Sequence, residues 1–342
     1  MAQPQGLTPL AWAASQGDDT LVAIFLGQED ICPDIPDEEG RTPLSWAARR
    51  GHAGAVGLLL QREDIDPDFP DSDGQTPLSW ASSNGHAVVV RQLLWREDVV
   101  PDKEDCSGRS ALSWAAMSGH VEVVSLLLER PDVNPNSRDS EGRTPVSWAS
   151  EMGEIGVVQL LMGKQGIELD LADSFGRTPL SWAVGEAMHQ VISLLLENDR
   201  VNPNLPDTRG RVPLLYAAVS GNVQVVKTLL EREDISPDIP CIYDRTPLWH
   251  AVYDGHKGVA KLLLEREDVD PNHCDDQGRT ALSWAAIHGD YETVILLLER
   301  ADIDADIADR NGNTPYMYSL MAGHRAVQMI LVNWRDTQVS VA

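Results

Sequence analysis

One motif returns along the chain at a constant spacing of 34 residues. Its clearest copy is Arg-Thr-Pro-Leu-Ser-Trp-Ala-Ala at residues 41–48, and the position of its Thr marks ten copies. A fixed period of this size indicates supersecondary units that stack on their neighbours, because one such unit cannot bury its apolar face alone. We therefore expect a single array over residues 1–342 rather than one globular core. The marker positions are Thr8, Thr42, Thr76, Ser110, Thr144, Thr178, Val212, Thr246, Thr280 and Thr314.

Within one copy, the order of residues predicts a turn, two helices and an extended arm. Residues 37–40 end in glycine, which favours a tight turn. The Thr-Pro pair at 42–43 is typical of a helix start, and Gly51 is typical of a helix end. A second helix carries the apolar run 56–60. The Asp-Pro-Asp sequence within 64–68 then leaves as an extended segment, because a residue before proline avoids the helical region.

This order of elements resembles the ankyrin repeat. The segments 40–48, 51–52, 56–60 and 64–68 stand where an ankyrin repeat has G-x-T-P-L-H-x-A-A, G-H, V-V-x-L-L-L and A-D-V-N-A. The resemblance covers all ten copies. It implies an all-α fold, an ankyrin-repeat solenoid of about ten helix-turn-helix units with hairpin-like loops and terminal capping repeats.

Two features of the repeats depart from the family pattern. Ser45 replaces the family's histidine in most copies, and the period is 34 rather than 33 residues. Both features, together with the Trp, resemble the ankyrin arrays abundant in filamentous fungi. Because the missing histidine removes a hydrogen bond of the turn, we expect Ser45 to provide a weaker local cap. We number the repeats 1 to 10 and expect an N-terminal cap at 1–34, internal repeats at 35–306, and a C-terminal cap and tail at 307–342.

Composition narrows the classes of partner. The net charge is −26 with a pI near 4.5, so the chain repels phosphate backbones and anionic lipids, and neither nucleic acid nor a membrane is expected as a partner. No apolar run approaches the roughly 18 residues of a spanning helix. The first residues hold no basic segment followed by an apolar run, so no signal peptide is expected. Four scattered cysteines without a C-x-x-C pair favour a cytoplasmic location, with the nucleus left open.

Several residue types recur in register along the array. We interpret the Gly-His histidines as structural junctions, and the acidic loops lack the spacing of a calcium loop, so no metal or cofactor is expected. An aromatic column and an arginine column lie on the first helices and turns. For the aromatic column we favour packing between repeats over ligand contact. For the arginine column we favour pairing with turn carboxylates such as Asp37, or with the next Trp face, over ligand contact. The aromatic column is Trp12, Trp46, Trp80, Trp114, Trp148, Trp182, Tyr216, His250, Trp284 and Tyr318, and the arginine column is Arg41, Gln75, Arg109, Arg143, Arg177, Arg211, Arg245 and Arg279.

The breaks in the pattern cluster in repeats 6 to 9. Repeat 8 departs most, because its turn at 241–244 lacks glycine and Trp249-His250 replaces Ser-Trp. A site recruited for one ligand should break the repeat locally, and aromatic anchors beside a few polar groups are typical of binding hot spots. Neutral drift in a tolerant array would produce the same breaks. The predicted partner-binding residues are Trp182, Arg211, Tyr216, Tyr243, Arg245, Trp249, His250, Tyr253, Asp254 and His288.

The favoured function is a non-catalytic scaffold that recognises a protein or peptide in its concave groove, mainly through repeats 6 to 9. The resemblance implies a binding module, and the chain has no G-x-S-x-G, P-loop or H-E-x-x-H motif. Its acidity favours a basic partner. The alternative is a protein that binds a small apolar ligand, or an enzyme whose catalytic candidates would be Glu186, His250, Asp254 and His288. A third interpretation, an array cut from a larger receptor, is left open.

Overall fold

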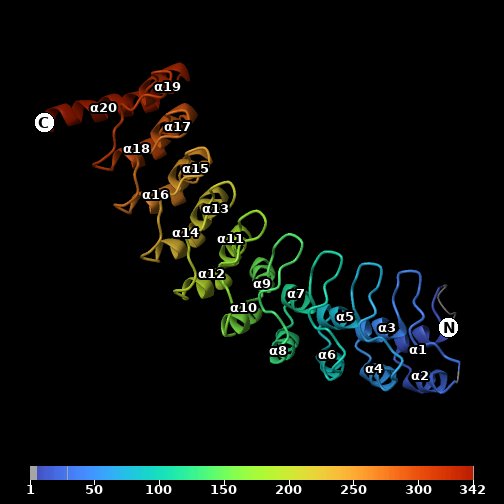
Figure 1. The fold of residues 1–342 in the computed structure, drawn as a ribbon. Coiled ribbons are helices and arrows are strands. Elements are labelled where there is room, and N and C mark those ends of the chain that lie inside the picture. The colour runs from blue at the N-terminus through green and yellow to red at the C-terminus, as the bar shows by residue number, and fades with distance from the viewer. Residues whose placement is uncertain (1–5, 29, 342) are drawn as a thin grey trace. The chain divides into compact units, whose positions relative to one another are not determined.

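The computed structural model describes residues 6–28 and 30–341, and within them it contains helices and turns but no strand. Residues 1–5 and Glu29 of the expected N-terminal cap, and Ala342 of the expected tail, lie outside the described residues. The chain divides into two compact units, Met1–Ser174 and Phe175–Ala342. Each unit is a stack of helix pairs (Figure 1). The all-α repeat fold predicted from the sequence is therefore confirmed.

The N-terminal unit holds five helix pairs. Each first helix packs against the first helix of the next repeat and against its own second helix. The first helices are α1 (Pro9–Gln16), α3 (Pro43–Arg50), α5 (Pro77–Ser83), α7 (Ala111–Met117) and α9 (Pro145–Met152). The second helices are α2 (Asp19–Leu26), α4 (Ala53–Leu60), α6 (Ala87–Leu94), α8 (Val121–Glu129) and α10 (Ile155–Met162).

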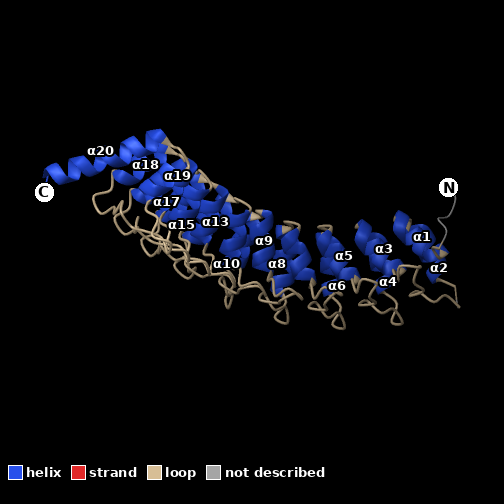
Figure 2. Ribbon diagram, turned by 90° about the horizontal axis from the view of Figure 1, so that it is seen from above, coloured by secondary structure: helices blue, strands red, loops and turns tan. Residues whose placement is uncertain are grey.

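The C-terminal unit repeats this arrangement, and its second helix in the last pair is much longer than the others. Figure 2 shows the loops that join its helices. The first helices are α11 (Pro179–Gly185), α13 (Pro213–Ser220), α15 (Pro247–Tyr253), α17 (Ala281–His288) and α19 (Pro315–Met321). The second helices are α12 (His189–Leu196), α14 (Val223–Leu230), α16 (Lys257–Leu264), α18 (Tyr291–Leu298) and α20 (Arg325–Val341).

The start and end of the first helices follow the predicted signals. In α3 the Thr42 hydroxyl accepts the N–H of Ser45 at 3.2 Å, and Pro43 occupies the first turn, where its missing N–H has no cost. Gly51 ends the helix with φ of 75°, in the left-handed region that favours glycine. Leu44 is fully buried beside two alanines of the same face. These small side chains let neighbouring first helices pack closely.

Three kinds of hydrogen bond recur between neighbouring repeats within a unit. The Ser72 N–H donates to the Glu39 carbonyl, which links two successive turns at 2.9 Å. The His52 ring lies 3.1 Å from the Ser15 carbonyl, as befits a junction residue. The Arg62 guanidinium donates to the Leu26 carbonyl at 3.2 Å, and similar bonds recur at the same register. The equivalent arginine bonds come from Arg96, Arg130, Arg232, Arg266 and Arg300.

Two non-glycine residues have left-handed backbone where the repeat normally has glycine. Ala187, at the end of α11, has φ of 57°, and Asp244, in the turn of repeat 8, has φ of 53°. Both lie among the repeats that the sequence marks as irregular. Backbone strain of this kind is typical of positions that the surrounding fold holds in place.

Candidate functional site

One turn carboxylate organises the aromatic and arginine columns in each regular repeat. Asp37 accepts the backbone N–H groups of Glu39 and Arg41 through Oδ1, both at 2.9 Å. Its Oδ2 accepts the Arg41 Nε at 3.0 Å and the Trp46 indole N–H at 2.9 Å. The Arg41 guanidinium lies 4.2 Å from the centre of the Trp46 ring. The turn that lacks the family's histidine is thus held by an Asp-Arg-Trp network.

The same network recurs along the array. Burial raises the pKa of the Asp37 carboxyl, but hydrogen bonds from Arg41, Trp46 and Glu39 outweigh burial and hold that pKa below its ordinary value. The indole or phenol bonds to the turn carboxylate are Trp80–Asp71, Trp114–Asp105, Trp148–Asp139, Tyr216–Asp207, Trp284–Asp275 and Tyr318–Asp309. In each of these repeats an aromatic residue binds the turn carboxylate, and in repeats 4, 7 and 9 the arginine binds it as well, through Nε. The sequence analysis anticipated pairing of the arginines with turn carboxylates but not the indole bond.

Repeat 8 breaks this network at two positions. Cys241 stands where the other turns have Asp, and His250 stands where they have Trp or Tyr. Trp249, one position earlier, is buried with 2% of its surface exposed. Its indole N–H lies 3.3 Å from Oδ2 of Asp275, the turn carboxylate of the next repeat. This Trp stands one residue earlier in its helix than the Trp of the other repeats. Its side chain therefore points inward, between α15 and α17.

The buried Trp249 supports a cluster of rings from two first helices. The Tyr253 ring stacks on it with centroids 4.8 Å apart. The Trp284 ring of α17 meets Tyr253 edge to face at 4.7 Å, and the His288 ring lies 5.5 Å from Tyr253. Tyr253 is 40% exposed, so its ring forms the outer surface of the cluster. Trp249 holds that surface from beneath and does not form it.

We call this surface the aromatic face and define it by Tyr243, Tyr253, Trp284 and His288. Tyr243 belongs to the turn of repeat 8 and is 50% exposed. The Arg245 guanidinium lies 5.1 Å from the Tyr243 ring and 4.5 Å from the Trp249 ring. A cation beside two rings binds them through their quadrupoles. Arg245 thus lies beside both the Tyr243 ring and the buried Trp249 ring, which supports Tyr253.

His250 and Asp254 form the titratable part of the same region. Their Nδ1 and Oδ2 atoms are 3.9 Å apart. Burial lowers the pKa of His250, Asp254 raises it, and the positive charges of Arg245 and Arg211 lower it further, so its pKa lies below the ordinary value. The His250 ring is therefore mostly uncharged at neutral pH. Asp254 is exposed, whereas only 18% of the His250 side-chain surface is exposed.

The predicted residues fall into three groups in the structure. Seven lie together around the aromatic face. Arg211 and Tyr216 share the Asp207 carboxylate of repeat 7, at 2.8 and 2.7 Å, and so follow the regular pattern. Trp182 lies in α11 of repeat 6, two repeats before α15, and Glu186 caps the C-terminal end of that helix. The seven are Tyr243, Arg245, Trp249, His250, Tyr253, Asp254 and His288. Sequence reasoning left out Trp284, although its place in the aromatic column could have indicated it.

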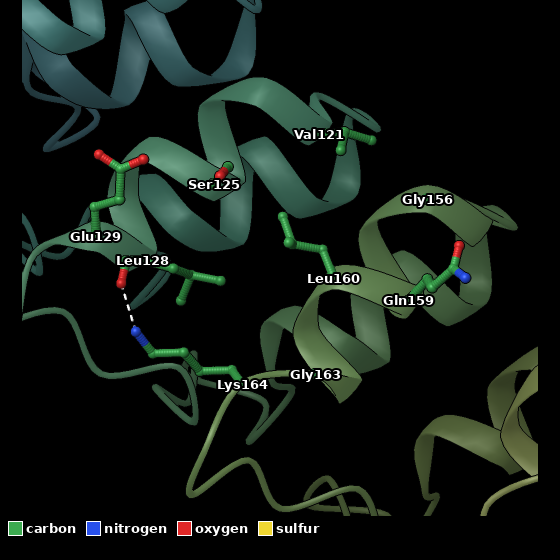
Figure 3. Close-up of a pocket in the computed structure, with 9 residues that line it drawn as sticks. All are labelled: Val121, Ser125, Leu128, Glu129, Gly156, Gln159, Leu160, Gly163 and Lys164. Atoms are coloured by element: carbon green, nitrogen blue, oxygen red, sulfur yellow. Dashed lines mark hydrogen bonds between the residues drawn. The ribbon is translucent and has the colours of Figure 1, made fainter.

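A second concave feature lies on the second helices of the N-terminal unit. A groove of about 580 Å³ separates α8 from α10 (Figure 3). Leu160 lines its wall together with Gly156 and Gly163, and a Cβ at Gly156 would lie 2.9 Å from the Val121 side chain. At one end the Lys164 ammonium donates to the Leu128 carbonyl. The sequence analysis did not anticipate this groove, and the two glycines of α10 were the available signal.

Comparison with protein-family models identifies the repeats. The ankyrin-repeat model, which describes three copies, matches residues 1–71, 57–139, 81–173, 131–206, 157–241, 189–275 and 248–340. This chain is an ankyrin-repeat protein. Ankyrin repeats generally mediate protein–protein interaction, which supports a binding scaffold. A comparison with curated proteins finds none that matches significantly. Within the described part of the ankyrin array, no helix is both long and apolar enough to cross a membrane.

Proposed function

We propose that this ankyrin array binds a partner protein or peptide on the aromatic face, within the C-terminal unit. The observation that favours this site is the exposed Tyr253 ring, stacked on a buried Trp249 and braced by Trp284. A ring fixed in one orientation loses little conformational entropy on binding, and Tyr and Trp are enriched in binding hot spots. The regular repeats 2 to 5 have no ring at the position of Tyr253.

The charge of the array adds to this proposal. A net charge of −26 speeds the approach of a partner that carries positive charge around its contact region. The open position of Tyr253 and Asp254 suits a polypeptide, which covers a surface, better than a small apolar ligand, which needs an enclosed pocket. The Asp254 carboxylate is exposed, so water reaches one member of the His250–Asp254 pair, and this disfavours proton transfer by the pair.

The proposal can be tested with a library of random short peptides selected on the intact array. We expect selected peptides to lose about tenfold or more in affinity on the Tyr253→Ala variant, because a central aromatic anchor is removed. The matched control is Ile295→Ala, since Ile295 is 43% exposed on the second helix α18. That variant should bind as the parent does. Peptides that bind both variants equally well would contradict the proposed site.

A further inference from the structure

A regular turn offers three donors to one carboxylate. In repeat 7, Asp207 Oδ1 accepts the backbone N–H groups of Arg209 and Arg211, both at 2.8 Å. Its Oδ2 accepts the Arg211 Nε, also at 2.8 Å. The same three donors, two backbone N–H groups and one guanidinium N–H, hold the turn carboxylates Asp37, Asp105 and Asp275.

Repeat 8 keeps the three donors and lacks the carboxylate. Cys241 occupies the Asp position, and its side chain has no charge and is a poor acceptor. The N–H groups of Tyr243 and Arg245 make no hydrogen bond to any residue that the structure describes. The Arg245 Nε is buried and is likewise without a partner among those residues. A buried donor left without an acceptor is costly, which marks this turn as incomplete.

The neighbouring acidic groups do not replace the missing Asp. Asp275 already accepts bonds from Arg279 and Trp284 and from the turn of repeat 9. Asp207 pairs with Arg211 at 2.7 Å, and Asp254 lies next to His250. Within the described part of the array, Arg245 has rings beside it but no ion pair. Arg245 as a whole is partly exposed, although its Nε is buried.

We propose that Arg245 binds a carboxylate of the partner, which replaces the Asp missing from repeat 8. This inference rests on the proposed function, and it adds the chemical class of the group that binds beside Tyr253. Arginine suits this role because its planar fork can stack on a ring and still donate two N–H bonds to a carboxylate. The carboxylate comes from an Asp or Glu side chain or from the C-terminus of a polypeptide.

The decisive variant is Cys241→Asp, which restores the residue found in the neighbouring turns. It should fold, because the same Asp is accommodated in repeats 7 and 9. We expect the restored Asp to accept hydrogen bonds from the turn N–H groups and to form an ion pair with Arg245. Peptides selected on the parent array should then bind about tenfold more weakly or worse. Arg245→Gln should have a similar effect. The control is Cys106→Asp, which adds the same charge at an exposed site in repeat 4.

Two changes in the peptide identify the source of the carboxylate. If a side chain supplies it, Asp→Asn or Glu→Gln in the peptide weakens binding. If the C-terminus supplies it, amidation weakens binding instead. Parental affinity for both Cys241→Asp and Arg245→Gln would overturn the carboxylate assignment. Failure of the proposed function can be told apart from failure of the carboxylate assignment. In the first case, peptide affinity would not depend on Tyr253.

Discussion

At the scale of single residues, the position of one carboxylate decides what the aromatic and arginine columns do. Where Asp is present, as in repeat 2, Trp46 and Arg41 are both committed to the turn. Where Cys241 replaces it, the arginine is left without its acceptor and the Trp at 249 is buried against the next repeat. The changes at Cys241, Trp249 and His250 together convert structural residues into candidates for binding.

The strained backbone of Ala187 gives a prediction at this scale. Left-handed backbone costs a residue with a Cβ about 1–2 kcal/mol relative to glycine. Ala187→Gly should therefore stabilise the array by about 1 kcal/mol, measured by urea unfolding followed by circular dichroism. Gly289→Ala, at the same position of repeat 9, should destabilise it, since the new Cβ would lie 2.6 Å from His324 Nδ1. An Ala187→Gly variant no more stable than the parent would contradict this account.

At the scale of one element, the extended arms carry Asp in some repeats and Asn in others at one position, and the two side chains bond differently. Asn136 accepts the Glu168 N–H at 3.0 Å and donates to the Gly166 carbonyl at 2.8 Å. Asp102, one repeat earlier, accepts the Asn134 N–H at 2.7 Å, but its Oδ1 is buried without a partner among the described residues. An ionised carboxylate cannot donate the second bond that the Asn amide makes.

From the comparison of Asn136 with Asp102, we predict that Asp102→Asn stabilises the array at pH 7. The new amide should donate to the backbone as Asn136 does, and a hydrogen bond of this kind contributes about 1 kcal/mol. The reciprocal change, Asn136→Asp, should destabilise the array by a similar amount. The free energies of unfolding of both variants, measured in urea, check this. Equal stability of Asp102→Asn and the parent would refute the account of the arms.

At the scale of the whole molecule, the buried arm carboxyls make stability depend on pH. Burial raises the pKa values of Asp34, Asp68, Asp102 and Asp238 above the ordinary value of 3.8. A raised pKa means that the stabilising protonated form is fully present below pH 3.8 and is lost as the pH rises through the folded-state pKa. The charged groups that face these carboxyls are Asp64, Asp66, Asp98, Lys103, Glu104, Asp132, Asp268, Asp270 and His273.

A fourfold Asp→Asn variant at these arm positions isolates that effect. The free energy of unfolding of the variant should exceed that of the parent only slightly near pH 3.8, because the parent's arm carboxyls are protonated there. The excess should grow as the pH rises to 7. Because the turn carboxylates are the same in both proteins, their contribution cancels when the two free energies of unfolding are subtracted. A difference that stays constant across this range would show that the arm carboxyls do not titrate in the folded state.

Much of this architecture could be predicted from the 34-residue period, because Thr-Pro starts and Gly ends recur in most repeats. The site was harder to predict. Placing Trp249 correctly required knowing that a shift of one residue points the ring between α15 and α17. The free donors at Arg245 depend on hydrogen bonds of the turn that only the folded chain shows, although Cys241 in the Asp column was a visible sign.

The most direct test of the central claim is to rewrite repeat 8 to the pattern of its neighbours. A variant with Cys241→Asp, Trp249→Ser, His250→Trp and Tyr253→Ser matches the regular pattern of repeat 3 at the last three positions. Its affinity for peptides selected on the parent should be compared by isothermal titration calorimetry. We predict a folded array with undiminished thermal stability and affinity lower by about a hundredfold or more. A folded variant that keeps the parental affinity would contradict the claim that the irregular repeat is the binding site.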